Sequence, residues 1–262
     1  MHTVNGLRLD VECSGDGEPV VLVHGSWSDL RAWDALAFPD TLRVIRYSRR
    51  GHSASECPPG QGTIADDVAD LAALVQTVGP AHLVGNSLGA EIALRLAVDR
   101  PELVRSLALH EPGFWSLAPD DPAVIAMRAR LAPAVERLAA GGREAGTRAF
   151  ADALFGPGAW DGAMPDALKR VMLANAMTFV DEERAPDYGA LDTARLPVVP
   201  TLLTLGEETD AAFVVVTERL AALLPHAERV TIAGAGHIPH RTHPDVYAEL
   251  VTRFVTTARA RR

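Results

Sequence analysis

A serine stands where an apolar segment turns into an amphipathic one. The stretch Gly85-Asn86-Ser87-Leu88-Gly89 follows the apolar run 81–84, which is typical of a buried strand, and precedes residues 91–98, whose apolar positions have helical spacing. A nucleophile at such a corner sits in strained backbone geometry, so its neighbours two positions away must be small, as the two glycines are. The helix that follows directs its first N–H groups at the oxygen of the reacting carbonyl. The pattern therefore predicts Ser87 as a nucleophile.

The segments on both sides of this serine predict an alternation of strands and helices. Strand patterns occur at 4–12, 19–23, 42–47, 81–84, 103–109, 200–205 and 229–233, and helical spacing of apolar residues occurs at 30–36, 64–78, 91–98, 211–224 and 244–258. Thr63, with Asp66 three residues later, predicts a capping box at the start of the helix 64–78. The alternation predicts an α/β fold with a doubly wound, mostly parallel sheet, whose loops after the strands converge on a ligand-binding edge.

A helical insertion interrupts this alternation. Strand patterns disappear between about residues 115 and 193, where helices are expected at 121–140, 143–154 and 165–180. Because strands and helices alternate again afterwards, we predict one core domain made of residues 1–114 and 194–262. Residues 115–193 would form a helical cap. In the core domain, a loop is expected at 58–62.

Composition and charge argue against several classes of partner. The formal net charge is −9 with no visible basic patch, which argues against nucleic acid and anionic membranes, and we expect residues 259–262 to be a solvated tail. No apolar run approaches the length of a membrane span, and the N-terminal residues lack the pattern of a secretory signal. With Cys13 and Cys57 as its two cysteines, the chain is expected to be cytoplasmic with free thiols. Composition does not indicate which oligomeric state the protein adopts.

Motifs spread along the chain resemble the α/β-hydrolase superfamily. They are Val23-His24-Gly25-Ser26-Trp27, Arg49-Arg50-Gly51-His52-Ser53, Gly85-Asn86-Ser87-Leu88-Gly89 and Gly234-Ala235-Gly236-His237. The resemblance implies the α/β-hydrolase fold and a serine hydrolase that needs no cofactor. Three shorter stretches are similar to a bacterial branch that includes lactone hydrolases of the zearalenone-degrading type: Leu109-His110-Glu111-Pro112, His237-Ile238-Pro239 and His243-Pro244-Asp245-Val246-Tyr247.

The resemblance also implies a base and an oxyanion hole for the serine. His237 lies in the glycine-rich loop after the last expected strand, where the superfamily places its histidine, so it is predicted to be the base. The backbone N–H groups of Leu88 and Ser26 would form the oxyanion hole, and the Ser26 hydroxyl is a candidate for a further donor. We expect His24 to support this loop by hydrogen bonds, and His82 and His110 to be packed or hydrogen-bonded.

Two carboxylates compete for the acid of the triad. In the superfamily the acid usually follows the penultimate strand, three residues after a glycine, but Thr209 occupies that position after Gly206 and Asp210 comes one residue late. A minority of the superfamily carries the acid after the strand that follows the serine's helix, where Glu111 stands. Asp210 can instead cap the helix that begins at Ala211. We predict Glu111 as the acid, with Asp210 as the alternative.

The aromatic residues are candidates for the wall of a pocket. The spacing of the histidines near the C-terminus raises the question of a metal site. Trp27, Phe114 and Trp115 are candidates for substrate binding, while Trp160 and Phe179 in the cap are as easily explained by core packing. His237, His240 and His243 recur every three residues, but Pro239 and Pro244 are expected to break any helix there, so no metal site is predicted.

Together these residues predict hydrolysis of a small carboxylic ester or lactone. Ser87 would attack the carbonyl carbon, and His237 would take the serine's proton and pass it to the leaving alkoxide. A C–C bond hydrolase or a cofactor-free perhydrolase could use the same three residues, and a small-molecule receptor of the same fold is the non-enzymatic alternative.

Overall fold

A single mixed sheet forms the centre of the computed structural model, which describes residues 1–58, 62–162 and 164–260. Its strand order is β3-β5-β4-β6-β7-β8-β9, with β3 antiparallel and the other strands parallel, so the predicted doubly wound α/β fold is confirmed. The strands of this sheet are β3 (Val11–Ser14), β4 (Glu18–Val23), β5 (Leu42–Tyr47), β6 (Ala81–Asn86), β7 (Val104–His110), β8 (Thr201–Gly206) and β9 (Glu228–Ile232), and β1 (His2–Val4) and β2 (Leu7–Leu9) pair in a separate two-stranded sheet.

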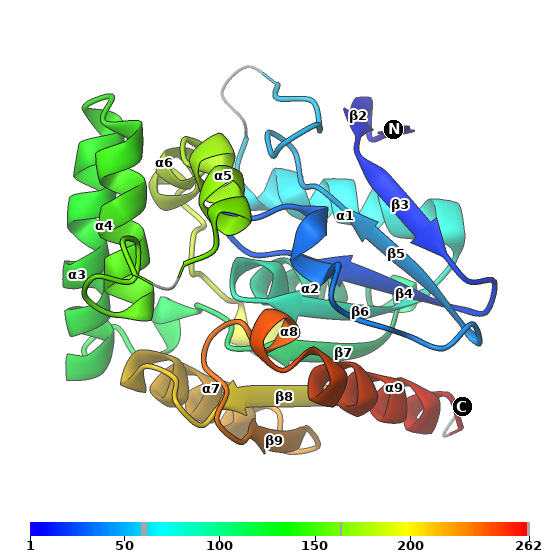
Figure 1. The fold of residues 1–262 in the computed structure, drawn as a ribbon. Coiled ribbons are helices and arrows are strands. Elements are labelled where there is room, and N and C mark those ends of the chain that lie inside the picture. Colours follow the sequence, from blue (N-terminus) through cyan, green and yellow to red (C-terminus); the bar gives the residue numbers. More distant parts are fainter. Residues whose placement is uncertain (59–61, 163, 261–262) are drawn as a thin grey trace.

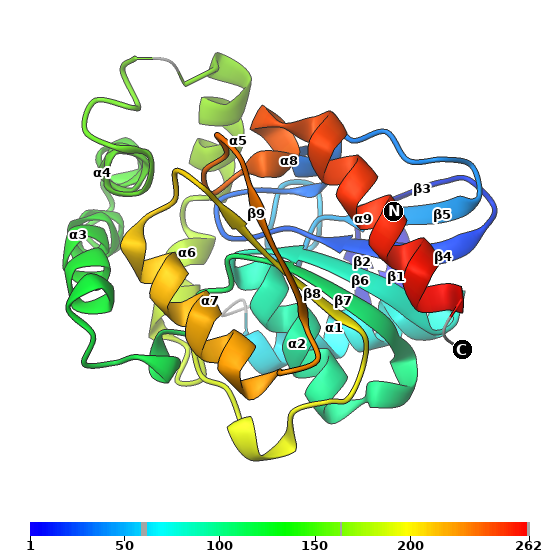
Figure 2. The same ribbon diagram turned by 90° about the horizontal axis from the view of Figure 1, so that it is seen from below.

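Helices cover both faces of the sheet (Figure 1 and Figure 2). One face carries α1 (Ile64–Val78), α2 (Leu88–Asp99) and α7 (Ala211–Leu223), and the other carries the 3₁₀ helix η1 (Leu30–Trp33), α8 (Pro239–Thr242) and α9 (Pro244–Ala260). Alternate residues of β4 supply both cores, because Val21 and Val23 join the cluster with α1 and α2, whereas Val20 and Leu22 join the cluster with α9. The central strands are thus buried on both sides, as parallel strands require.

The insertion consists of helices at one end of the sheet (Figure 1). It contains η3 (Trp115–Leu117), α3 (Pro122–Ala139), α4 (Arg143–Phe155), α5 (Asp166–Asn175) and α6 (Thr178–Arg184). No strand occurs between residues 115 and 193 in the part of this range that the structure describes. The single helix predicted at 165–180 is wrong, because the helix is interrupted between α5 and α6 at Ala176 and Met177.

Three further details differ from the prediction or lie outside the described residues. The strand predicted at 4–12 is divided by a turn at Asn5 and Gly6, which have φ angles of 50° and 79°. Pro239 and Pro244 begin α8 and α9 instead of breaking helices, because the first helical position needs no N–H donor. Residues 59–61 of the predicted loop and residues 261–262 of the predicted tail lie outside the described residues, whereas residues 259–260 continue α9.

The capping box at the start of α1 is confirmed. The Thr63 side chain accepts a hydrogen bond from the backbone of Asp66, and the Asp66 carboxylate accepts one from the Thr63 N–H at 2.7 Å. Asp187, which follows α6, also accepts a hydrogen bond from the backbone N–H of Ala65 at 2.9 Å. The segment after α6 is thereby attached to the N-terminus of a core helix, where a carboxylate is favoured by the helix dipole.

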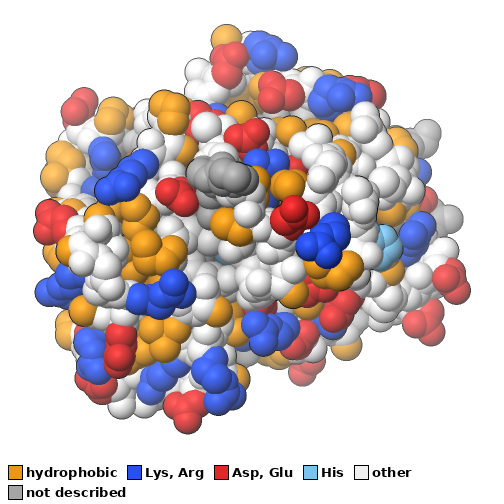
Figure 3. Space-filling model, turned by 90° about the horizontal axis from the view of Figure 1, so that it is seen from above, with side chains coloured by type: hydrophobic (Ala, Val, Ile, Leu, Met, Phe, Trp, Pro, Cys, Tyr) orange, Lys and Arg blue, Asp and Glu red, His pale blue; other side chains and the backbone are white. Residues whose placement is uncertain are grey.

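Among the described helices, none is long and apolar enough to cross a bilayer. Lys and Arg side chains are mixed with Asp and Glu on the face seen from above (Figure 3). Charge on this face is therefore not segregated by sign. The predicted lack of nucleic acid and anionic membrane partners stays a prediction.

A buried carboxyl group lies in the first turn of α2. Glu91 is 1% exposed, and its Oε2 has no hydrogen-bond partner among the described residues. Burial raises the pKa of Glu91 to about 8, although Arg95 opposes the increase. The folded protein therefore holds a proton on Glu91 at neutral pH, while the ordinary pKa of the group is 4.5.

We expect Glu91→Gln to stabilise the protein in a pH-dependent way. Above about pH 4.5 the unfolded carboxyl group loses its proton while the folded one keeps it until about pH 8, so the wild-type free energy of unfolding falls as pH rises through this window. The amide does not titrate. The gain of the variant should be larger at pH 8 than at pH 5 by about 3–4 kcal/mol, measured by urea unfolding. An equal difference at both pH values would contradict this assignment.

Candidate active site

Ser87 lies at the sharp corner between β6 and α2. Its backbone has φ 54° and ψ −125°, a conformation that L-residues rarely adopt. The neighbouring glycines make this corner possible, since a Cβ at Gly89 would lie 2.0 Å from the carbonyl oxygen of Val23 and one at Gly85 would lie 2.5 Å from that of Gly89. The Ser87 N–H donates to the carbonyl oxygen of His110 at 2.9 Å, which fixes the corner against β7.

His237 and Glu111 come from separate loops and meet beside this corner. The Nδ1 atom of His237 donates to Oε2 of Glu111 at 2.7 Å. Glu111, which directly follows β7 and has φ 47°, also accepts hydrogen bonds at 2.8 Å from the N–H of Gly206 and from the hydroxyl of Thr209. This carboxylate is fully buried and held by three donors, so its orientation toward the imidazole is fixed.

The electrostatic surroundings keep Glu111 ionised. Burial alone would raise its pKa, but His110, His237 and the N–H of Gly206 outweigh burial and lower the pKa to about 2. His110 is fully buried, and burial lowers its pKa to about 4 although Glu111 acts in the opposite direction. Phe213 stacks on the His237 ring with centroids 4.2 Å apart, so the imidazole is fixed by packing as well as by its hydrogen bond.

The alternative acid, Asp210, is engaged elsewhere. Its side chain caps α7 by accepting from the N–H of Ala212 at 2.9 Å, and it forms an ion pair with Arg130 of α3. Thr209 occupies the position where the superfamily usually carries its acid, and its hydroxyl donates to Glu111 instead. The position that usually supplies the acid therefore supports the acid that comes from β7.

The loop after β4 carries Ser26, the second predicted oxyanion-hole residue. His24 supports this loop as expected, because its Nδ1 hydrogen-bonds to the carbonyl oxygen of Gly25 at 2.8 Å and its Nε2 accepts from the N–H of Arg49 at 2.9 Å. The Ser26 hydroxyl interacts with the Glu182 carboxylate and helps to lower the pKa of that group, and its role as a further oxyanion donor stays a prediction. The backbone N–H groups of Ser26 and Leu88 remain the predicted donors.

A buried ion network joins this loop to α6 of the insertion. Arg49 is fully buried and pairs with Asp67 of α1 at 2.9 Å and with Glu182 of α6 at 2.5 Å. Burial disfavours the charge of Glu182, but Arg49, His52 and Ser26 outweigh burial and hold its pKa well below the ordinary value. Loss of one member would leave an uncompensated buried charge, so the network couples the position of α6 to the loop that carries Ser26.

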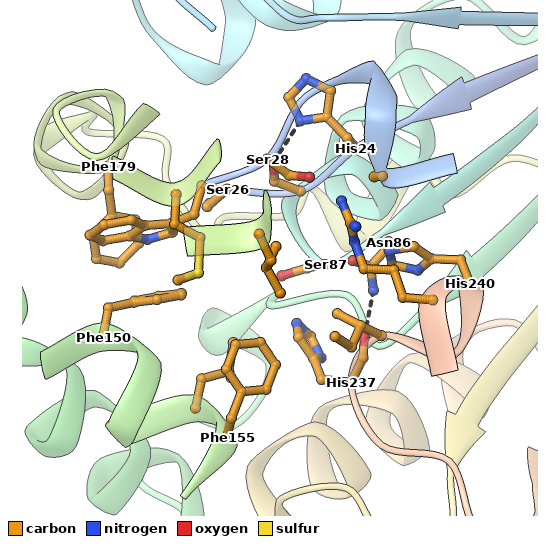
Figure 4. Close-up of a pocket in the computed structure, with 18 of the residues that line it drawn as sticks. His24, Ser26, Ser28, Asn86, Ser87, Phe150, Phe155, Phe179, His237 and His240 are labelled. Atoms are coloured by element: carbon orange, nitrogen blue, oxygen red, sulfur yellow. Dashed lines mark hydrogen bonds between the residues drawn. The ribbon is translucent and has the colours of Figure 1, made fainter. Parts of the chain in front are cut away.

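Ser87 and His237 point into a shared cavity of about 790 Å³, open mouth included (Figure 4). Trp27 and Trp115 line it as predicted, and Trp27 stacks on Phe150 of α4 with centroids 4.4 Å apart. The insertion also contributes apolar side chains that line the cavity: Leu131, Phe150, Leu154, Phe155, Leu168, Met172 and Phe179. Their number and aromatic character suit an apolar part of a small molecule.

Two aromatic residues named from the sequence do not reach this cavity. Phe114 was predicted to bind substrate, but it is fully buried in the hydrophobic core and does not line the cavity. Trp160 is likewise packed in the core, whereas Phe179 lines the cavity. Adjacent residues in a loop point in different directions, so Trp115 faces the cavity while its neighbour Phe114 faces the core.

Several residues of the site carry no local signal in the sequence. They are Thr209, Glu182, Phe150, Phe155, His240 and Arg241. The insertion residues among them belong to helices whose apolar spacing indicates burial without saying against which surface. Among residues 1–58, 62–162 and 164–260, no cluster of His, Cys, Asp and Glu could hold a metal ion.

We expect the two carboxylates to respond differently to neutralisation. Glu111→Gln removes the charge that orients His237 and stabilises the imidazolium, so kcat on a p-nitrophenyl ester should fall by roughly 10³–10⁴. Asp210→Asn keeps the helix cap and lies away from His237, so kcat should change by less than about threefold. Steady-state kinetics of both variants, with circular dichroism as a check of folding, tests the assignment. A large loss in Asp210→Asn with an active Glu111→Gln would reverse it.

The chain is similar to known proteins over most of its length. A family model described as "Alpha/beta hydrolase family" matches residues 20–250. The 2-(acetamidomethylene)succinate hydrolase of Mesorhizobium japonicum is 25% identical over 269 residues, which cover 96% of this chain and 93% of that protein.

Solved structures share the arrangement of strands and helices. The enol-lactonase from Burkholderia xenovorans LB400 has a TM-score of 0.79 at 21% identity and covers 97% of this chain and 99% of its own. Est816, described as an N-acyl homoserine lactone degrading enzyme, has a TM-score of 0.71 at 25% identity and covers 95% of this chain and 98% of its own. The first of these likenesses shows the fold alone.

Proposed function

The chain belongs to the alpha/beta hydrolase family, and we propose that it is a serine hydrolase that cleaves a carboxylic ester or a lactone through an acyl-enzyme intermediate. The observation that carries this proposal is the hydrogen bond of 2.7 Å between His237 and Glu111, beside the strained corner that presents Ser87 to the same cavity. The narrower resemblance to zearalenone-type lactone hydrolases stays a prediction.

The reaction would begin with attack of the Ser87 hydroxyl on the substrate carbonyl. His237 takes the hydroxyl proton on Nε2, because its Nδ1 already donates to Glu111 and fixes the tautomer. Negative charge then forms on the carbonyl oxygen, where the backbone N–H groups of Ser26 and Leu88 would stabilise it. Collapse of this intermediate breaks the ester C–O bond, and His237 gives its proton to the leaving alkoxide.

Water would release the acyl group in the second half of the reaction. His237, again neutral, accepts a proton from water as the water attacks the acyl-enzyme, and Ser87 recovers its proton when the second intermediate collapses. The ionised Glu111 stabilises the imidazolium in both halves, and its pKa of about 2 keeps it ionised in this role. For a lactone, the leaving alkoxide stays attached to the acyl group, so the product is a hydroxy acid.

We assign the insertion, residues 115–193, the role of a cap that shapes the substrate site. Its side chains line the cavity that contains Ser87, and Glu182 fixes α6 to the core through Arg49. Est816, at 25% identity, is described as degrading a lactone, which supports this substrate class without naming the substrate of this chain. The substrate would be a small molecule with an apolar part.

We expect Ser87→Ala to abolish hydrolysis while the fold remains. Removal of the nucleophile should lower kcat on p-nitrophenyl acetate by at least about 10³, because only the oxyanion hole and binding remain. Wild-type protein should release a burst of p-nitrophenol equal to the active-site concentration if deacylation is slower than acylation. A folded Ser87→Ala protein with normal activity would refute the proposal.

Burst kinetics together with a panel of substrates separates the proposed function from the other candidate functions. A receptor that does not turn over substrate would show neither a burst nor steady hydrolysis in a panel of lactones and of short-chain and aromatic esters. A C–C bond hydrolase or a perhydrolase would depend on Ser87 but would show low kcat/KM on every ester and lactone of the panel. High kcat/KM on one ester or lactone class supports the proposed reaction.

A further inference from the structure

Three polar residues that line the cavity each carry a buried side-chain nitrogen with no hydrogen-bond partner among the described residues. Arg241 and His240 of α8 and Trp33 of η1 all line it. The Nη2 atom of Arg241, the Nδ1 atom of His240 and the Nε1 atom of Trp33 are buried and have no hydrogen-bond partner among the described residues. A buried donor without an acceptor is costly, so a cavity that retains such donors is suited to a ligand that supplies acceptor oxygens.

The charge of Arg241 is not neutralised by a direct ion pair in the described part of the chain. The acidic groups that raise its pKa are Asp29 and Asp34, but Asp29 already accepts from the side chain of Arg31, and Asp34 pairs with Arg46 at 2.5 Å. Burial accordingly lowers the pKa of Arg241, with Arg31 acting in the same direction and the two carboxylates in the opposite one. The guanidinium keeps its proton at any physiological pH, so it is a cation that can pair with an anionic ligand.

The neighbours of Arg241 hold it without using its charge. Its backbone N–H donates to the carbonyl oxygen of Ile238 at 2.9 Å, which places the residue one turn after His237. His240 packs against Trp33 with ring centroids 4.7 Å apart, and burial holds the pKa of His240 well below its ordinary value. A neutral imidazole can donate from Nδ1 in one tautomer, so each of the three residues that line the cavity can supply an N–H donor.

His240 and the aromatic wall lie on different sides of the nucleophile. Figure 4 shows His240 on one side of Ser87 and Phe150 and Phe179 on the other. A substrate whose reacting carbonyl lies at Ser87 can therefore direct one end to the aromatic wall and the other to the donors near His240. An anionic end would pair with a guanidinium, which forms strong charge-assisted hydrogen bonds with carboxylates.

We propose that the substrate carries a carboxylate, in addition to the ester or lactone that is cleaved, and that Arg241 binds this carboxylate with help from His240 and Trp33. The inference rests on the proposed hydrolase function and adds the substrate class. Arg241 discriminates by charge, because an uncharged substrate would leave the buried Nη2 without an acceptor.

Two matched pairs of esters test this inference by kinetics. Monomethyl succinate and methyl 4-methylpentanoate have similar shapes and differ in charge on the acyl side, and acetoxyacetate and isobutyl acetate do so on the alcohol side. In at least one pair, wild-type kcat/KM should favour the anionic ester, and Arg241→Met should reduce this preference by about 100-fold, with partial recovery in Arg241→Lys. Arg130→Met, which removes a cation from α3 outside the cavity, should leave the preference within about twofold.

Calorimetry on Ser87→Ala protein gives a readout that does not depend on turnover. The anionic ester that wild type prefers should bind, and the added Arg241→Met substitution should weaken its Kd by about 100-fold, whereas added Arg130→Met should not. If wild type prefers neither anionic ester, or if Arg241→Met lowers kcat/KM equally for both members of the pair, the inference is overturned while the hydrolase function stands. If an anionic ester binds through Arg241 but wild type cleaves no ester or lactone, the anion site at Arg241 stands, whereas the hydrolase function and the substrate class that rests on it are both overturned.

Discussion

The backbone of Ser87 is held in a conformation that an isolated chain would avoid, and the rest of the site is arranged around it. A φ of 54° at a residue with a side chain costs on the order of 1–3 kcal/mol. Three hydrogen bonds oppose this cost, one from the Ser87 N–H to His110 and two from Ala90 and Glu91 to the Ser87 carbonyl oxygen. The corner brings the first N–H groups of α2 and the serine hydroxyl to the same side, which a relaxed strand end would not do.

The position of the acid follows from how the neighbouring strands end. Because β7 lies next to β6, a carboxylate just after β7 starts close to the serine corner and can support the histidine from there. Gly206 and Thr209, at the end of β8, then serve as donors to Glu111, while Asp210 caps α7 and holds α3 through Arg130. The loop after β8 thus contributes hydrogen-bond donors to the site, whereas its own carboxylate, Asp210, has a structural role.

The parts of the fold that depend on local chemistry could be predicted from the sequence. The strand pattern of β5 and the capping box at Thr63 gave boundaries that agree with the structure, because strand burial and helix capping act within a few residues. Pro239 was misjudged because the same ring that interrupts a helix interior is favourable at the first helical position. The break between α5 and α6 leaves no comparable signal in residues 176–177.

The same distinction between local and long-range determinants applies to the residues of the site. The elbow around Ser87 is a local pattern, but the contact between Arg49 and Glu182 spans 133 positions and depends on how the insertion docks. For Phe114 and Trp115, residue type does not indicate which side chain reaches the cavity, since Phe114 points to the core and Trp115 to the cavity. Arg241 could not be distinguished from other arginines until the structure placed it in the cavity lining with its buried Nη2 lacking a hydrogen-bond partner among the described residues.

Covalent labelling of the nucleophile tests the central claim most directly. Wild-type protein would be treated with a fluorophosphonate, which reacts with an activated serine hydroxyl, and the adduct would be counted by intact-mass spectrometry and located by peptide mapping. The account predicts one adduct per chain, located on Ser87, and a loss of ester hydrolysis in proportion to the labelled fraction. Full labelling of Ser87 with undiminished hydrolysis, or an inactivating adduct on another residue, would contradict it.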